Sequence, residues 1–118
     1  MSKESYISDA IDWVNKRSAT SLKANFDGFE KPKAFLNKSS DEEVRPDISF
    51  IGQGGEKNYT EIAVKEKKQQ KLVTRWKLLS MMASIKRGKL FLLAPRGHKM
   101  FVEKLVRKYH INAFIYSI

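Results

Sequence analysis

Cysteine is absent from the 118 residues of this chain. Without thiols the chain has no disulfide, no thiolate-bound zinc or iron–sulfur site and no thiol nucleophile. Long hydrophobic runs are absent too, because no apolar stretch approaches the ~20 residues of a membrane span. The first residues lack the apolar core of a signal peptide. We therefore expect a soluble, intracellular, cytoplasmic protein with no membrane partner, and the small lysine-rich chain would suit a phage gene.

Acidic residues are scarce relative to basic ones. The chain has 13 Asp and Glu against 23 Lys and Arg, which gives a formal net charge of +10. A field of that sign attracts polyanions, and nucleic acid is the commonest of these inside cells. A ribosome-like or merely soluble basic protein is the alternative. The length leaves room for one hydrophobic core, so we expect one domain over residues 1–118.

Hydrophobic periodicity predicts the elements of this domain. Their order, α-β-β-β-α-β-α-β, predicts an α/β fold with a mixed central sheet flanked by helices on both faces. The acidic, serine-rich segment 39–43 is expected to be a loop, and Gly88 is expected to stop the long second helix. The predicted helices cover residues 5–16, 69–87 and 98–109, and the predicted strands lie within 21–37 and at 45–51, 59–65, 89–94 and 112–118.

Two of the predicted strands form an antiparallel hairpin around the glycine-rich turn at residues 52–55. In each strand, apolar side chains alternate with a second set that points to the opposite face. Ile48 and Phe50 form the apolar face of the first strand, and Ile62 and Val64 form that of the second. The opposite face carries Asp47 and Ser49 on the first strand and Glu61, Ala63 and Lys65 on the second.

Asp47 and Glu61 are the candidate catalytic pair. Hydrolysis of a phosphodiester needs a divalent metal held by hard oxygen ligands close to the scissile phosphate. It also needs a positive group that stabilises the charge developing in the transition state. Two carboxylates on neighbouring strands of one hairpin meet the first need. The pattern predicts that their oxygens converge in a shared pocket.

The order of elements, the Pro46-Asp47 pair and Glu61 in the next strand together resemble the PD-(D/E)xK nuclease superfamily. Type II restriction enzymes and small Holliday-junction resolvases belong to this superfamily, and the chain resembles a small resolvase-like member. The resemblance covers nearly the whole chain in architecture, whereas the motif spans only a few residues. It implies a restriction-endonuclease-like fold, Mg²⁺ or Mn²⁺ as cofactor and a homodimer.

The resemblance also implies a set of metal ligands. Asp47 and Glu61 would bind the metal, with the backbone carbonyl of Ile62 as a third ligand. Many members add an acidic residue from the first helix. Glu4 is the candidate here, with Asp9 or Asp12 behind it. The alternative for Glu4 is a solvated carboxylate favoured by the dipole at the start of a helix.

One position departs from the superfamily pattern, which has a lysine two residues after the acid where this chain has Ala63. Three explanations remain open. A neighbouring lysine substitutes, either Lys65 about 6.6 Å farther along the strand, or Lys68 or Lys71 from the next helix. Alternatively, the domain has lost catalysis and kept binding, or a Lys→Ala change was introduced to disarm a toxic enzyme. Loss of one such charge typically costs ~10²–10³ in rate.

A basic tract leads out of the candidate site. Its side chains could neutralise the phosphates that flank the cut, or they could form an ordinary solvated helix face. His98 and His110 lack a second ligand or an acid partner, so structural or surface roles are favoured over a general-base role. The two tryptophans lie on apolar helical stripes and are expected in the core. The tract consists of Lys65, Lys67, Lys68, Lys71, Arg75 and Lys77.

These observations favour a Mg²⁺- or Mn²⁺-dependent endonuclease that acts on DNA. Little sequence is left for base-reading loops, so selection of branched or single-stranded structure is expected rather than site recognition. The alternative is a non-catalytic nucleic-acid-binding module, which Ala63 favours. A third hypothesis is an assembly or regulatory protein whose basicity is incidental.

Overall fold

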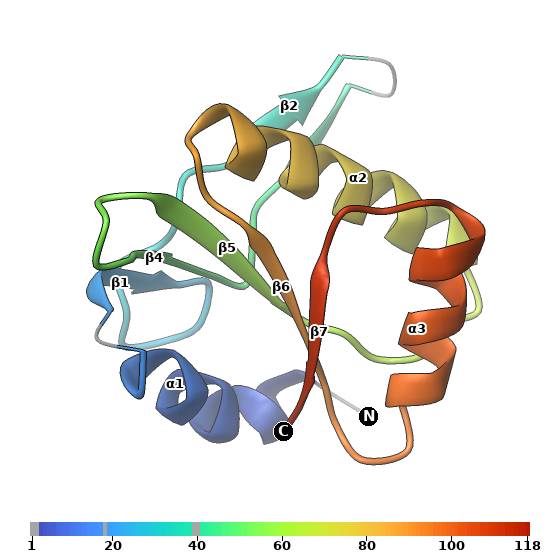
Figure 1. Cartoon of the computed structure of the whole chain (residues 1–118), viewed down its shortest axis with the longest axis horizontal. Helices are drawn as coiled ribbons and strands as arrows, with labels where there is room; N and C mark the ends of the chain where they lie inside the picture. Colours follow the sequence, from blue (N-terminus) through green and yellow to red (C-terminus); the bar gives the residue numbers. More distant parts are fainter. Residues whose placement is uncertain (1–2, 18, 39–40) are drawn as a thin grey trace.

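The computed structural model describes residues 3–17, 19–38 and 41–118. A five-stranded mixed sheet in the order β1-β4-β5-β6-β7 lies at the centre of the molecule, with helices against it (Figure 1). This confirms the predicted α/β class. In chain order the elements are η1 (Lys3–Tyr6), α1 (Ile7–Asn15), β1 (Thr20–Ala24), β2 (Phe35–Asn37), β3 (Glu42–Val44), β4 (Ile48–Ile51), β5 (Lys57–Ile62), α2 (Gln69–Ile85), β6 (Leu90–Ala94), α3 (Lys99–Lys108) and β7 (Phe114–Ser117).

The strand pairing follows from the connections. β4 pairs antiparallel with both β1 and β5, and the predicted β4–β5 turn is closed by a hydrogen bond from the Gly55 N–H to the Gly52 carbonyl at 3.0 Å. β6 pairs parallel with both β5 and β7. Parallel neighbours need a crossover, and α2 and α3 supply the two crossovers here.

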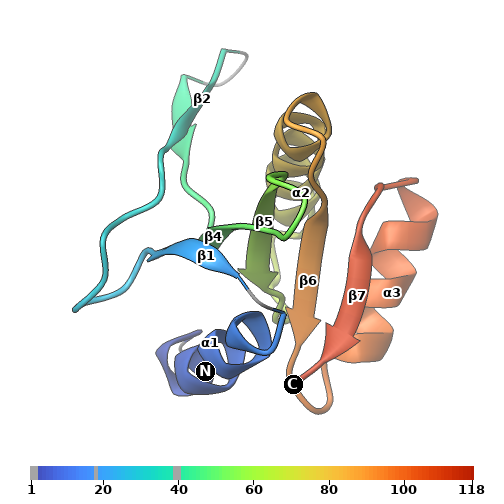
Figure 2. The same ribbon diagram turned by 60° about the vertical axis from the view of Figure 1, so that its left-hand side comes forward.

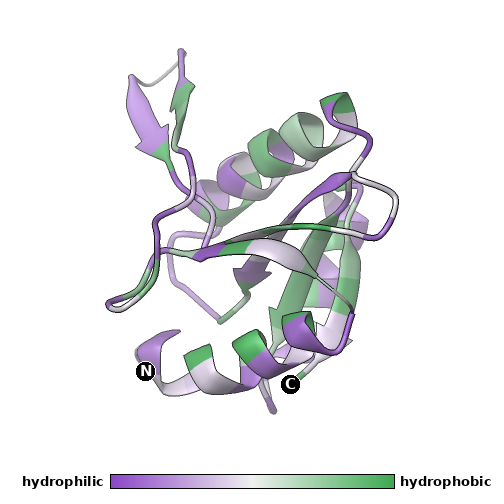
Figure 3. Ribbon diagram, turned by 90° about the vertical axis from the view of Figure 1, so that its left-hand side faces the viewer, coloured by the Kyte–Doolittle hydropathy of each residue, from purple (hydrophilic) through white to green (hydrophobic). Residues whose placement is uncertain are grey.

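The helices divide the core into two layers, one on each face of the sheet. α1 covers one face, and α2 and α3 cover the other (Figure 1). Polar and hydrophobic residues alternate along α1 and α2 (Figure 3), as burial of one side of each helix requires. Trp76 of α2 is buried. Trp13 of α1 is partly buried against the apolar cluster between α1 and the sheet, so both tryptophans lie at the predicted core positions. Among the described residues, no helix is long and apolar enough to cross a membrane.

A second, two-stranded sheet projects from the body of the molecule (Figure 2). It corrects the prediction of a loop at 39–43, because Glu42 and Glu43 belong to β3, which pairs antiparallel with β2. Residues 39–40 lie outside the described part of the chain. Phe35 anchors the hairpin by packing edge-on against Tyr59, with ring centroids 5.5 Å apart.

Helix α2 ends two residues before the predicted boundary. The left-handed residue that stops it is Arg87, with φ +63°, and not Gly88. The Arg87 N–H donates to the Ser84 carbonyl at 3.1 Å, and the Gly88 N–H donates to the Ala83 carbonyl at 2.8 Å. These two bonds form a Schellman motif, whose left-handed position is usually glycine. Helix α3 ends with a second left-handed residue, His110, at φ +53°.

Gly88 has a different reason to be glycine. A Cβ atom built on it would overlap the backbone carbonyl of Lys57. The start of β6 therefore approaches the start of β5 too closely for any side chain at this position. The glycine predicted as a helix stop is explained instead by the packing of two strands.

Candidate active site

Asp47 and Glu61 lie opposite each other where β4 begins and β5 ends. The register pairs Ile48 with Thr60, so Asp47 and Glu61 occupy the next step outward. The backbone N–H of Asp47 donates to Oε2 of Glu61 at 2.7 Å, and the N–H of Ile62 donates to Oδ2 of Asp47 at 2.9 Å. Each side chain therefore bonds to the backbone of the other strand. Both carboxylates lie near Nη2 of Arg75, so they are close together, and the shared pocket stays a prediction.

Two cations complete this arrangement. Arg75 of α2 donates through Nε to Oε1 of Glu61 and through Nη2 to Oε2 of Glu61 at 3.2 Å. Its Nη2 lies 3.9 Å from Oδ1 of Asp47 and also donates to the carbonyl of Arg45. Lys3 of η1 places its Nζ 2.9 Å from Oδ2 of Asp47. We call Lys3, Asp47, Glu61 and Arg75 the charge quartet.

Burial sets the electrostatics of the quartet. Glu61 is 0% exposed and Asp47 is 5% exposed, and burial raises the pKa of a carboxyl because the charged form loses hydration. For Asp47, burial and the nearby negative charge of Glu61 outweigh the contact with Lys3 and raise the pKa to about 6. For Glu61, burial is outweighed by the charges of Lys3 and Arg75, which hold its pKa below the usual range.

Burial acts in the opposite direction on the two cations, because it lowers the pKa of a lysine or an arginine. Burial lowers the pKa of Lys3, but the charges of Glu61 and Asp47 outweigh this and raise it. The pKa of Arg75 is also raised, because Glu61 and Asp47 together outweigh the effect of burial. Both cations therefore stay charged at neutral pH. Asp47 is the member of the quartet whose protonation changes near pH 6.

Local structure explains how the side chains reach this point. Leu72, Trp76 and Leu79 form the buried stripe of α2 that faces the sheet. Arg75 lies on the flank of this stripe, so its long side chain extends along the helix surface to the end of β5. Lys3 precedes α1 on the other face of the sheet. The quartet thus joins the two helical layers around the ends of β4 and β5.

The oxygens of Asp47 and Glu61 suit a hard divalent cation. Mg²⁺ typically takes one or two carboxylates and completes its shell with water and substrate phosphates. In this structure the oxygens of the pair contact Lys3, Arg75 and two backbone N–H groups, so a metal bound there would have to displace some of these contacts. Over the described residues, no group of three or more acidic, histidine or cysteine side chains comes together. Glu4 therefore does not join the pair, and Asp9 and Asp12 are exposed on α1.

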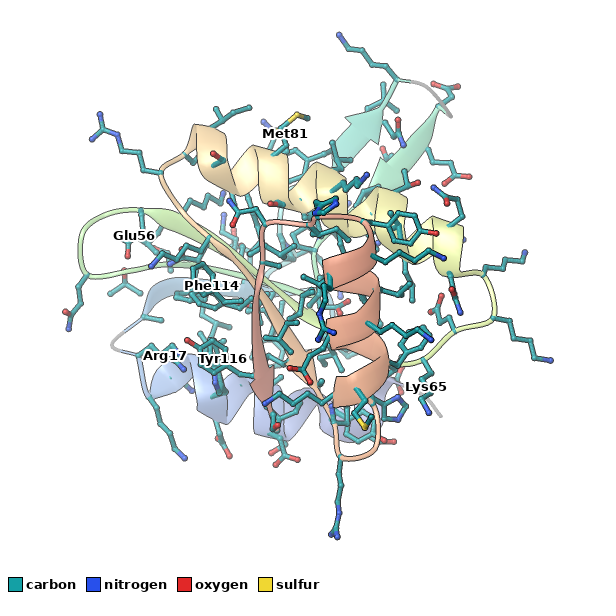
Figure 4. The ribbon with its side chains drawn as sticks, turned by 45° about the vertical axis from the view of Figure 1, so that its right-hand side comes forward. Arg17, Glu56, Lys65, Met81, Phe114 and Tyr116 are labelled. Atoms are coloured by element: carbon teal, nitrogen blue, oxygen red, sulfur yellow. The ribbon has the colours of Figure 1, made fainter. Side chains whose placement is uncertain are left out.

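Ala63 and Lys65 do not provide a cation to this site. The prediction that the strand continues to Lys65 is wrong, because β5 ends at Ile62. Ala63 is 1% exposed in the apolar cluster that also contains Leu72. Lys65 is exposed on the loop before α2 (Figure 4), where its backbone N–H donates to Nδ1 of His98 at 2.9 Å. His98 thus has the structural role that the sequence favours.

The remaining residues of the basic tract separate into two environments. Lys67, Lys68 and Lys71 are exposed around the start of α2. Arg75 is half-buried in the quartet and is therefore not a surface contact like the others. A cavity of about 440 Å³ adjoins Arg75 between α2 and the projecting hairpin. It is lined by Asn37, Glu42, Glu43, Val44, Gln70, Lys71, Thr74 and Arg75.

Comparison of the chain with protein-family models, curated proteins and solved structures finds no match. A fold of this general class supports many functions, so the function has to follow from the residues of the site. Those residues are two converging carboxylates, two cations that contact them and a basic surface beside them.

Proposed function

We propose that this chain is a Mg²⁺- or Mn²⁺-dependent endonuclease of the PD-(D/E)xK type that acts on DNA. The observation that carries the proposal is the convergence of Asp47 and Glu61 at the ends of two neighbouring strands. The five-stranded mixed sheet with helices on both faces supports a restriction-endonuclease-like topology of the small, resolvase-like kind.

In this proposal Asp47 and Glu61 hold the metal, and the backbone carbonyl of Ile62 is the candidate third ligand. A bound divalent cation supplies an activated water and neutralises charge on the phosphate. Glu61 remains ionised because its pKa is held low. Lys3 favours the ionised form of Asp47, the form that binds metal.

Arg75 is our candidate for the positive group that Ala63 does not provide. It contacts both carboxylates from α2, so in this proposal its guanidinium would also contact a phosphate bound at the pair. The planar fork of guanidinium donors matches phosphate oxygens better than a lysine ammonium does. Arg75 would then exchange a carboxylate contact for a phosphate contact when DNA binds.

The basic surface beside the site supports DNA as the substrate. Lys65, Lys67, Lys68 and Lys71 are all exposed between the end of β5 and the first turn of α2. Ammonium groups there can neutralise phosphates on either side of the cut. We propose selection of branched or single-stranded DNA structure, and a homodimer that presents two sites.

A second candidate is a nucleic-acid-binding module without catalysis. Ala63 is packed in the core, and Lys3 and Arg75 already neutralise both carboxylates within the chain. In this alternative the quartet is a structural brace that joins the two layers. The basic surface would then bind nucleic acid and no bond would be cut.

A cleavage assay separates the two candidates. Branched, single-stranded and linear duplex DNA are incubated with the protein and Mg²⁺ or Mn²⁺, with chelator as a blank. Asp47→Asn and Glu61→Gln are compared with Glu103→Gln, a change on α3 away from the quartet. Circular dichroism checks that each variant is folded. If the Glu61→Gln variant does not fold because Glu61 is buried, the Asp47→Asn variant still tests the proposal.

The endonuclease proposal requires metal-dependent cleavage that falls by ~10² or more in Asp47→Asn and is kept in Glu103→Gln. Cleavage by an Ala63→Lys variant alone would identify a disarmed nuclease. Salt-sensitive binding with no cleavage by any variant would support the binding module. A chain that neither cuts nor binds DNA would contradict both candidates.

A further inference from the structure

A polar cavity lies where β1, β4 and β5 run side by side, away from the quartet. Its volume is about 220 Å³. Lys23 of β1 pairs with Ser49 of β4, and Ile51 of β4 pairs with Lys57 of β5, so three adjacent strands contribute to it. The lining residues are Ser21, Lys23, Ser49, Phe50, Ile51 and Lys57. We call this cavity the bulge pocket.

The backbone of β1 is irregular at this pocket. Thr20 pairs with Ile51 and Lys23 pairs with Ser49, so three steps along β1 match two along β4. An extra residue of this kind is a β-bulge, which changes the side chains presented to the partner strand. Without it, Leu22 would lie opposite Ser49. The bulge therefore places Lys23, and not the apolar Leu22, opposite Ser49.

Ser21, within the bulge, has φ +51°. The left-handed region is unfavourable for a residue with a Cβ atom, and such strain persists where the surrounding structure enforces it. Strained backbone of this kind is concentrated at binding and catalytic sites. Here it occurs at a serine whose position is in the wall of a polar cavity.

The bulge pocket is lined by two lysines, and none of its six lining residues is acidic, so no lining side chain neutralises their positive charge. Burial lowers the pKa of Lys57, and the positive charges of Lys86, Lys23 and Lys33 lower it further. Lys23 has one acidic neighbour, Glu30, at 3.8 Å, and that carboxylate is largely exposed. An anion in the pocket would relieve this repulsion between lysines.

We propose that the bulge pocket binds a phosphate group. Two ammonium groups and two hydroxyls supply donors from several directions, and a phosphate offers several strong acceptor oxygens. The cavity has room for such a group, because its volume is several times the ~30 Å³ share of one water molecule. Neither Asp47 nor Glu61 lines the pocket, so the proposal does not depend on nuclease activity.

The phosphate could belong to a nucleic-acid backbone or to a small phosphorylated molecule. Lys57 precedes Glu61 by four residues on β5, which corresponds to about 13 Å along the strand. On duplex DNA this distance spans about four base steps at 3.4 Å per step. One nucleic acid could therefore reach both the quartet and the bulge pocket, and the test has to distinguish the two sources.

The test is an NMR titration of the whole chain with sodium phosphate, with sodium chloride at matched ionic strength as reference. The backbone amides of Ser21, Lys23, Ser49 and Lys57 are followed. We expect saturable shifts at these amides with phosphate only. The double variant Lys23→Met/Lys57→Met should weaken phosphate binding by roughly tenfold or more. Lys104→Met, an exposed change on α3, should leave it unchanged.

A parallel titration with a short oligonucleotide identifies the source. Shifts at the same amides, lost in the double variant, assign the pocket to the nucleic-acid backbone. Phosphate binding without an oligonucleotide response assigns it to a small phosphorylated molecule. Non-saturable phosphate shifts, or unchanged affinity in the folded double variant, would overturn the proposal. Asp47→Asn should abolish cleavage without changing phosphate binding, which separates this proposal from the nuclease.

Discussion

At the residue scale, the protonation of Asp47 couples the charge quartet to pH. Its pKa is about 6 in the folded chain against an ordinary value of 3.8, because of burial and the repulsion of Glu61. A carboxyl of this kind binds more protons when folded than when unfolded between these two values. Its contribution to stability is therefore greatest below about pH 4 and falls as the pH rises to about 6.

The contribution of Glu61 to stability changes with pH in the opposite direction to that of Asp47. Its folded pKa lies below the ordinary 4.5, so its contribution is present above that value and is lost as acid protonates the folded state. The two carboxyls consequently titrate in different windows. Between pH 4.5 and pH 6, the change in stability from the pair comes from Asp47.

The Asp47→Asn variant should remove the loss of stability that occurs between pH 4.5 and pH 6. Because the neutral amide avoids burial of a negative charge beside Glu61, we expect the variant to be more stable than the parent at pH 7 by about 1–3 kcal/mol. The free energy of unfolding is measured with urea at pH 4.5 and pH 7 in both proteins. Asp9→Asn, on the exposed side of α1, is the matched control. Equal pH dependence in parent and Asp47→Asn would contradict the prediction.

Lys3 should hold the pKa of Asp47 down. The ammonium lies 2.9 Å from Oδ2 of Asp47 and favours its charged form, so Lys3→Met should move the Asp47 midpoint to higher pH. The expected change is ~1 pH unit, the usual size for loss of one close partner. It is measured from the carboxyl ¹³C shift of Asp47. Lys16→Met, at the exposed end of α1, should leave the midpoint where it is.

Only part of the quartet could be predicted from the sequence. Asp47 and Glu61 interrupt apolar strands at positions that an antiparallel hairpin brings opposite each other, so local alternation is enough to pair them. Lys3 is 44 residues from its partner Asp47, and no local pattern records that contact. Arg75 lies beside the buried stripe of α2, where a basic residue is also typical of an ordinary solvated face. The contacts of Lys3 and Arg75 with the carboxylates depend on how the two helical layers pack on the sheet, which the sequence pattern does not show.

At the element scale, the long elements were predictable because their hydrophobic patterns extend over several turns or a whole strand. The predicted order matches the five-stranded sheet and the α-helices α1, α2 and α3 once the 3₁₀ turn η1 and the small hairpin are set aside. β2 and β3 were missed because each has three residues, which is too few to show an alternation of polar and apolar side chains. The overrun of β5 to Lys65 has a similar cause, since Ala63 and Val64 continue the alternation after strand pairing has ended.

The end of α2 carries an element-scale prediction. Arg87 holds a left-handed conformation that costs a residue with a Cβ atom, and glycine adopts it freely. Arg87→Gly should therefore stabilise the chain by about 0.5–1 kcal/mol in chemical denaturation. Arg87→Ala keeps the Cβ atom and should show little of this gain. A gain as large in Arg87→Ala would assign the effect to the lost charge, not to the backbone.

At the scale of the whole molecule, the charge quartet contributes nothing to the net charge. Its two cations and two carboxylates cancel, so the other residues carry the whole formal charge of +10. The positive field that would attract DNA therefore arises from the surface around the quartet. The exposed lysines before α2 and those at the bulge pocket are two parts of this surface.

This distribution predicts how DNA binding responds to salt. Each phosphate contact releases condensed counterions, so the affinity falls with a slope of about 0.9 per contact against the logarithm of salt concentration. If the tract before α2 follows the DNA backbone, Lys65→Gln/Lys67→Gln/Lys68→Gln should lower this slope by about 2–3. Lys16→Gln/Lys104→Gln/Lys108→Gln removes the same charge from α1 and α3, so it lowers the general field equally but should leave the slope nearly unchanged. Fluorescence anisotropy with labelled duplex between 50 and 200 mM salt measures both. Equal losses in the two triple variants would mean that DNA responds to total charge alone, and a defined path past Asp47 and Glu61 would then have no support.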